Sequence, residues 1–97
     1  MSEGAQRIAG MPWYDREDYP RILAMMEDAH VLAPVYDQWL AAAENNEREA
    51  QRVGVRTLRA IIRPDAFAAW CAERGLPPTS KARMQYVHEF TARAQEG

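Results

Sequence analysis

Apolar side chains recur at spacings of three and four residues over four long segments of the chain, as they do on the buried face of a helix. These segments span about residues 18–30, 34–52, 64–75 and 79–95. Pro20, Pro34 and Pro64 lie near the start of the first three, where a proline fits because the first helical turn leaves its N–H groups unpaired. The pattern therefore predicts four helices.

Residues 55–62 form a different kind of segment, which is short and rich in β-branched side chains between Gly54 and Pro64. Such a segment predicts a β-strand. A lone strand leaves its backbone N–H and C=O groups without partners, so it needs a neighbour. Either residues 6–11 fold back on it as a weak N-terminal strand, or a second copy of the chain pairs with it. We favour the second copy, antiparallel across a two-fold axis, and expect a homodimer.

The predicted fold is α+β and mostly α, with four helices around a single strand in the order helix, helix, strand, helix, helix. The fourth helix is expected to turn Met84 inward, on the same face as Val87 and Phe90. Most of the expected core consists of large apolar side chains, namely Tyr19, Ile22, Leu23, Met26, Tyr36, Trp39, Leu40, Leu58, Ile61, Phe67, Trp70, Cys71, Val87 and Phe90.

Length and composition fit a single domain. A chain of 97 residues with 47% hydrophobic side chains supplies enough apolar bulk for one compact core. Small and polar residues dominate positions 1–10 and predict a flexible lead-in, so the compact domain is expected to cover residues 11–97. No stretch approaches the roughly 20 apolar residues that span a bilayer, and the start of the chain lacks the apolar block of a signal peptide. We expect no membrane association.

The net charge and the cysteine content limit which partners and which cellular compartment we expect. A net charge of −2 offers no strong field for nucleic acid or anionic lipid, so a nucleic-acid partner is not expected. A single cysteine cannot form a disulfide within the chain, which favours the cytoplasm. One set of cations is either scattered solubilising charge or an anion-binding surface: Arg56, Arg59, Arg63, Lys81, Arg83 and Arg93.

Candidate catalytic groups do not form a recognisable set. Cys71 has His30 and His88 as conceivable bases, but it lies on the apolar stripe of its helix and is expected in the core. Two distant histidines and one cysteine match none of the compact ligand spacings of zinc sites. Gly54 and Gly75 stand alone at helix ends and do not form a phosphate-binding loop. The sequence therefore predicts no catalytic residue, no metal site and no cofactor, and it favours a non-enzymatic role.

Trp13, Tyr14 and Arg16 are the strongest candidates for an interaction surface. They lie in a predicted non-helical stretch, and their residue types are over-represented at binding hot spots. The alternative is that the two aromatic rings simply cover the small core.

The favoured function is a non-enzymatic interaction or regulatory module, such as an accessory protein or a phage-type inhibitor, which binds a protein partner. The competing function is a small-molecule-binding protein or minor enzyme. That protein would use a pocket between helices formed by His88, Glu89 and Tyr86 together with an arginine of the strand.

Several strings of residues carry a resemblance to a known family: Pro12-Trp13-Tyr14, Arg16-Glu17-Asp18-Tyr19, Tyr36-Asp37-Gln38-Trp39-Leu40 and Pro64-Asp65-Ala66-Phe67-Ala68-Ala69-Trp70-Cys71. The chain resembles a family of small bacterial proteins of unknown function from about Met11 to Ala94. The resemblance implies no catalytic or binding residue. It also makes Met11 an alternative start of the chain.

Overall fold

The computed structural model describes residues 7–96. Its elements follow one another as β1 (Ile8–Trp13), α1 (Tyr19–Met25), α2 (Tyr36–Arg52), β2 (Arg56–Ile61), α3 (Pro64–Arg74) and α4 (Ser80–Glu96). Short 3-10 turns at Arg16–Asp18 and Ala29–Val31 flank α1. The prediction of an α+β fold that is mostly α, with four helices, is confirmed.

β1 and β2 pair in parallel, with Ile8 opposite Arg56 and Trp13 opposite Ile61. The N-terminal segment is thus a partner of the strand predicted from the sequence. Parallel strands need a long crossover connection, and α1 and α2 supply it here. Residues 8–10 of the expected flexible lead-in belong to β1, and residues 1–6 lie outside the described part. Pairing with a second copy concerns the other edge of β2 and stays a prediction.

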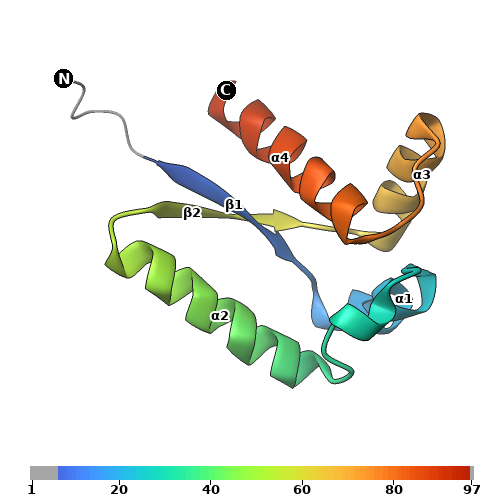
Figure 1. Cartoon of the computed structure of the whole chain (residues 1–97), viewed down its shortest axis with the longest axis horizontal. Helices are drawn as coiled ribbons and strands as arrows, with labels where there is room; N and C mark the ends of the chain where they lie inside the picture. Colours follow the sequence, from blue (N-terminus) through green and yellow to red (C-terminus); the bar gives the residue numbers. More distant parts are fainter. Residues whose placement is uncertain (1–6, 97) are drawn as a thin grey trace.

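The strands lie between two helices of 17 residues each. Figure 1 shows α2 on one side of the strands and α4 on the other, with α1 and α3 together at one end. Side chains of β2 alternate between these sides. Thr57 and Arg59 reach α2, where they bond to Gln51 and Glu47. In the described part of the chain, no helix is long and apolar enough to cross a lipid bilayer.

Gly10 sets how closely α4 lies on β1. A Cβ atom at this position would come 1.9 Å from Thr91 Oγ1 and 2.9 Å from Val87 Cγ1, well inside van der Waals contact. The Thr91 hydroxyl donates a hydrogen bond to the Val87 carbonyl at 2.8 Å, so its polar atom is satisfied inside this tight contact. Any side chain at position 10 would therefore push the helix away from the strand.

Five aromatic rings form the centre of the core at the carboxyl end of β1. This aromatic cluster has ring centroids between 5.0 and 5.8 Å apart and consists of Trp13, Tyr14, Tyr19, Tyr36 and Trp39. The Tyr19 hydroxyl donates to the Ala33 carbonyl at 2.6 Å, and the Tyr36 hydroxyl donates to the Tyr14 carbonyl at 2.8 Å. These bonds let the apolar parts of both rings be buried without leaving their hydroxyl groups unsatisfied.

Two details of the predicted core are wrong. Ile61 is 37% exposed, whereas Ala60 and Ile62 are completely buried, because successive side chains of a strand point to opposite faces. Met84 is 51% exposed, because it lies away from the inner stripe of α4 on which Val87 is buried.

The first helix is shorter than the predicted 18–30. It ends at Met25, and Met26 is already extended at φ −80° and ψ 135°. Directly after it, the Glu27 N–H donates to the Pro78 carbonyl at 2.9 Å, in the linker between α3 and α4. A tertiary hydrogen bond therefore replaces continuation of the helix. The limits of the other three helices agree with the prediction within two residues.

Candidate functional site

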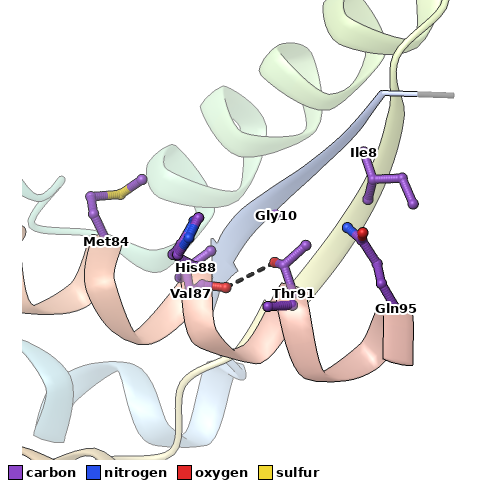
Figure 2. Close-up of a pocket in the computed structure, with 8 residues that line it drawn as sticks. Ile8, Gly10, Met84, Val87, His88, Thr91 and Gln95 are labelled. Carbon is purple, nitrogen blue, oxygen red and sulfur yellow. Dashed lines mark hydrogen bonds between the residues drawn. The ribbon is translucent and has the colours of Figure 1, made fainter. Parts of the chain in front are cut away.

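An open groove of about 450 Å³ runs between α4 and β1. In Figure 2, Met84 and His88 lie toward one end of it, Ile8 and Gln95 lie toward the other, and Thr91 faces the strand beside Gly10. Gly10 lines the groove, although no space for a Cβ atom remains at that position, because Thr91 and Val87 pack directly against the strand there. Its walls are mixed, with apolar side chains beside one imidazole and one amide.

The structure does not bring the predicted pocket residues together. His88 borders the groove, whereas Tyr86 packs its ring edge-on against Phe67 and Trp70 of α3, at 5.4 and 5.3 Å. Glu89 accepts hydrogen bonds from Trp70 and from Arg74, also on α3. The bond from Arg74 is the main reason that the pKa of Glu89 lies below its usual value. Tyr86 and Glu89 therefore connect α4 to α3, on a different side of the helix from His88.

Trp13 and Tyr14 lie in the core, 5% and 1% exposed, so they cannot provide the contact surface predicted from the sequence. The alternative, that both rings cover the core, matches their burial. Burial also raises the pKa of Tyr14 to about 12, which the charge of Arg83 only partly offsets. Arg16 remains exposed, and its guanidinium lies 4.7 Å from the centre of the Tyr36 ring and bonds to Asp37.

Cys71 is buried in the core, as expected, and burial raises the pKa of its thiol. A thiol with a raised pKa is a poor nucleophile because little of it is ionised near neutral pH. Within residues 7–96, no group of three or more His, Cys, Asp and Glu side chains is placed to hold a metal ion.

Arg83 has a role that the sequence did not reveal. It is only 5% exposed and donates to Asp28 at 3.1 Å, and the other carboxylate oxygen of Asp28 accepts the Ser80 N–H at 2.7 Å. The Asp28 carboxylate, in the segment after α1, thus binds both the buried Arg83 guanidinium and the first turn of α4. Partial burial favours a higher pKa for Asp28, but the bonds from Ser80 and Arg83 and the Arg83 charge outweigh it and lower the pKa. The sequence contains one signal for the burial of Arg83. Arg83 lies four residues before Val87, and this spacing places both residues on the inner face of α4.

Other cations of the predicted basic set are also held by carboxylates. Arg59 donates two hydrogen bonds of 2.8 Å to Glu47 and lies 3.9 Å from the centre of the Trp13 ring. Arg63 pairs with Asp15 and Asp18. Such paired guanidinium groups contribute little to an anion-binding surface.

The backbone of β2 faces outward at every second residue. The N–H groups of Arg56 and Ile62 donate to carbonyls of Arg7 and Trp13, so the even-numbered residues of β2 face β1. The odd-numbered residues Thr57, Arg59 and Ile61 consequently direct their N–H and C=O groups away from β1. We call these outward groups the β2 edge. Among the described residues, β1 is the one strand that pairs with β2.

The same register turns Ile8, Gly10 and Pro12 of β1 outward, on the opposite side of the sheet. Pro12 has no N–H group, so this side cannot donate a hydrogen bond at the third outward position. A proline on an edge strand discourages pairing with another strand. The two edges of the sheet therefore differ, and the β2 edge is the one that keeps its full set of donors and acceptors.

Two hollows border the β2 edge. One, of about 370 Å³, lies where α2 passes into β2 beside Gln51, Gly54 and Thr57. The other, of about 440 Å³, lies between β2 and the end of α4 and is lined by Leu58 and Ala94 among others. Leu58 is only half-buried at this hollow. The surface next to the open backbone groups is thus incompletely filled on both faces of the sheet.

Comparison with known families gives a match over most of the chain. A family model described as a domain of unknown function (DUF8829) matches residues 11–96. The resemblance to an uncharacterised family is thereby confirmed, whereas the motif pattern and the bacterial origin stay predictions. Curated proteins and solved structures yield no match.

Proposed function

The chain belongs to the DUF8829 family, whose function is unknown, and we propose that it is a cytoplasmic, non-enzymatic interaction or regulatory module that binds a protein partner. The observation that supports this proposal is the β2 edge, with outward N–H and C=O groups at Thr57, Arg59 and Ile61. A partner segment in extended conformation can add to such an edge as a further strand.

The size of the sheet favours strand addition. Parallel sheets of two strands are unusual, because parallel pairing is slightly weaker per residue and such sheets are normally larger and covered. Here helices lie on both sides of the strands, and within residues 7–96 β2 has no strand beside it other than β1. An added strand would enlarge the sheet where its backbone groups are open.

Side chains next to the edge are already held in place. Arg59 is fixed by two hydrogen bonds to Glu47 and by the Trp13 ring, and the Thr57 hydroxyl accepts a bond from Gln51. Little side-chain freedom remains to be lost when a partner binds, which favours affinity. An accessory protein, or an inhibitor of a larger machine, would bind its target by pairing a segment of that target with the β2 edge as an additional strand.

Thr57→Pro tests the proposal, because it removes one outward N–H without removing a hydrogen bond between β1 and β2. Thr57→Ala is the matched control, since it loses the same hydroxyl but keeps the N–H. Tagged wild-type and variant chains are each mixed with lysate of the native host and with untagged chain, and the captured proteins are collected. We expect at least one partner, identified by mass spectrometry, to be retained by wild type and Thr57→Ala and lost with Thr57→Pro.

Equal capture by all three chains would show that the β2 edge is not the recognition element. Thermal unfolding establishes that the variants are folded. Should Thr57→Pro unfold, Ile61→Pro serves in its place, because Ile61 is the last residue of β2 and also directs its N–H outward.

A further inference from the structure

We infer that the strand added at the β2 edge is β2 of a second copy, antiparallel across a two-fold axis that passes beside Leu58. This inference rests on the proposed function and names its partner. It combines three observations: the direction of the backbone groups, the hollow beside Leu58 and the distribution of charge on α2.

The backbone groups select the register. In an antiparallel pair, outward-facing residues must lie opposite outward-facing residues of the partner. An axis at Leu58 places Thr57 opposite the partner's Arg59, twice, so that four main-chain hydrogen bonds form. All the groups that form them belong to the β2 edge.

Neighbouring registers fit less well. An axis at Arg59 would put two guanidinium-bearing residues directly opposite each other, and like charges in that position are destabilising. An axis at Thr57 would require the Val55 N–H, which already donates to the Ala50 carbonyl at 3.0 Å. An axis at Ala60 would also give four main-chain bonds, between Arg59 and the partner's Ile61. It would, however, oppose two Ala60 side chains that are completely buried within their own chains, so neither would offer apolar surface for the other copy to cover.

The hollow beside Leu58 fits the same axis. Leu58 shares a face of the sheet with α4, and it is half-buried at the edge of the hollow of about 440 Å³. In this register the two Leu58 residues form a directly opposed pair without hydrogen bonds, in which Cβ atoms approach to about 4.5–5.5 Å. Each leucine would then cover apolar surface of the other copy.

Charge on α2 is complementary to its own copy. Glu47 and Gln51 bond to β2, so the next residues around the helix, Glu44 and Arg48, lie on the flank beyond β2. Along that flank the acidic residue comes first and Arg48 and Arg52 follow toward the end of the helix. A two-fold axis through the sheet sets the two α2 helices antiparallel, so Glu44 of each lies toward the Arg52 end of the other, where Arg52 also pairs with Glu49 of its own helix.

Cysteine cross-linking tests the register. Leu58→Cys, Arg59→Cys and Ala60→Cys each mark a different axis, and the native chain is the control because its Cys71 is buried. After mild oxidation, we expect Leu58→Cys to give the highest yield of disulfide-linked dimer on a non-reducing gel. A higher yield from Arg59→Cys or Ala60→Cys would overturn the register.

Light scattering and sedimentation of the unmodified chain test the partner. We expect a dimer at micromolar concentration, a monomer for Thr57→Pro, and for Glu44→Arg a dissociation constant raised about two- to five-fold, as for one unfavourable charge contact. A monomeric wild-type chain would overturn the inference. If the β2 edge still captured another protein in that case, the proposed function would stand with a different partner, whereas loss of both would remove both.

Discussion

The aromatic cluster and the β2 edge lie on the same small sheet but treat their polar groups in opposite ways. In the cluster, Tyr19 and Tyr36 bury their rings and donate both hydroxyl groups to backbone carbonyls of the same chain. At the β2 edge, the backbone groups of Thr57, Arg59 and Ile61 face away from the sheet. The first region satisfies its polar groups within the chain, whereas the second leaves backbone groups that we propose are satisfied by another chain.

We therefore expect the aromatic cluster to determine the stability of the fold and the β2 edge to determine binding. Burying a large aromatic side chain contributes a few kcal/mol, whereas an exposed ion pair such as Arg16 with Asp37 contributes about 0–1 kcal/mol. We therefore expect most of the free energy of unfolding to depend on the cluster and on the contact of α4 with the sheet. The β2 edge can then change without loss of the fold.

Trp39→Ala should have the largest effect on stability. The Trp39 ring contacts four other rings of the aromatic cluster, and its removal leaves a cavity that the rigid neighbours cannot fill. We expect a loss of about 3–5 kcal/mol in the free energy of unfolding, measured by denaturant titration. Trp39→Phe, which keeps a ring, should lose clearly less. A loss below that of Thr57→Ala would contradict the division between the two regions.

Gly10→Ala should follow, because the new Cβ would overlap Thr91 Oγ1. Overpacking of this kind costs about 1–3 kcal/mol, and we expect a value in the upper half of that range. Thr91→Ala removes the overlapping oxygen, so the double variant should regain part of the loss in the same titration. If Gly10→Ala were neutral, α4 would not lie as closely on β1 as the structure has it.

Asp28→Asn should have the smallest effect of the three, about 1–2 kcal/mol, because Asn still accepts from Ser80 but no longer neutralises Arg83. The pKa of Asp28 is lower in the folded chain than its ordinary 3.8, so the carboxylate stabilises the fold above pH 3.8. That contribution is lost as the pH falls from 3.8 through the lowered value. Melting temperatures of wild type and variant should therefore differ at pH 7 and converge as the pH falls below 3.8; a constant difference would refute this.

The helices could be predicted because the spacing of apolar residues within each segment is enough to indicate a helix. β1 was predicted only as a weak alternative at residues 6–11, since Gly10 and Pro12 interrupt the alternation of a strand, and its six residues become a strand through pairing with β2. The early end of α1 likewise depends on a hydrogen bond to the distant Pro78. These features arise from tertiary contacts that no short window of sequence contains.

The candidate site was harder to predict than the fold. Trp13 and Tyr14 have the residue types of binding hot spots, but the same types fill cores, and composition does not distinguish the two. The sequence predicted that the strand at residues 55–62 would need a neighbour, and β1 is one such neighbour. Which residues of β2 face outward depends on the register with β1, and that register became visible only in the structure.

Pro12 limits the size of any assembly built by strand addition. When two copies join through β2, both outer rims of the resulting sheet are β1 strands, and each rim has a proline in place of a donor. A third chain arriving there would find an interrupted ladder of hydrogen bonds, so in the proposed dimer we expect growth to stop at two copies. In such a dimer, the same residue that makes β1 a poor strand by sequence would oppose polymerisation into fibres.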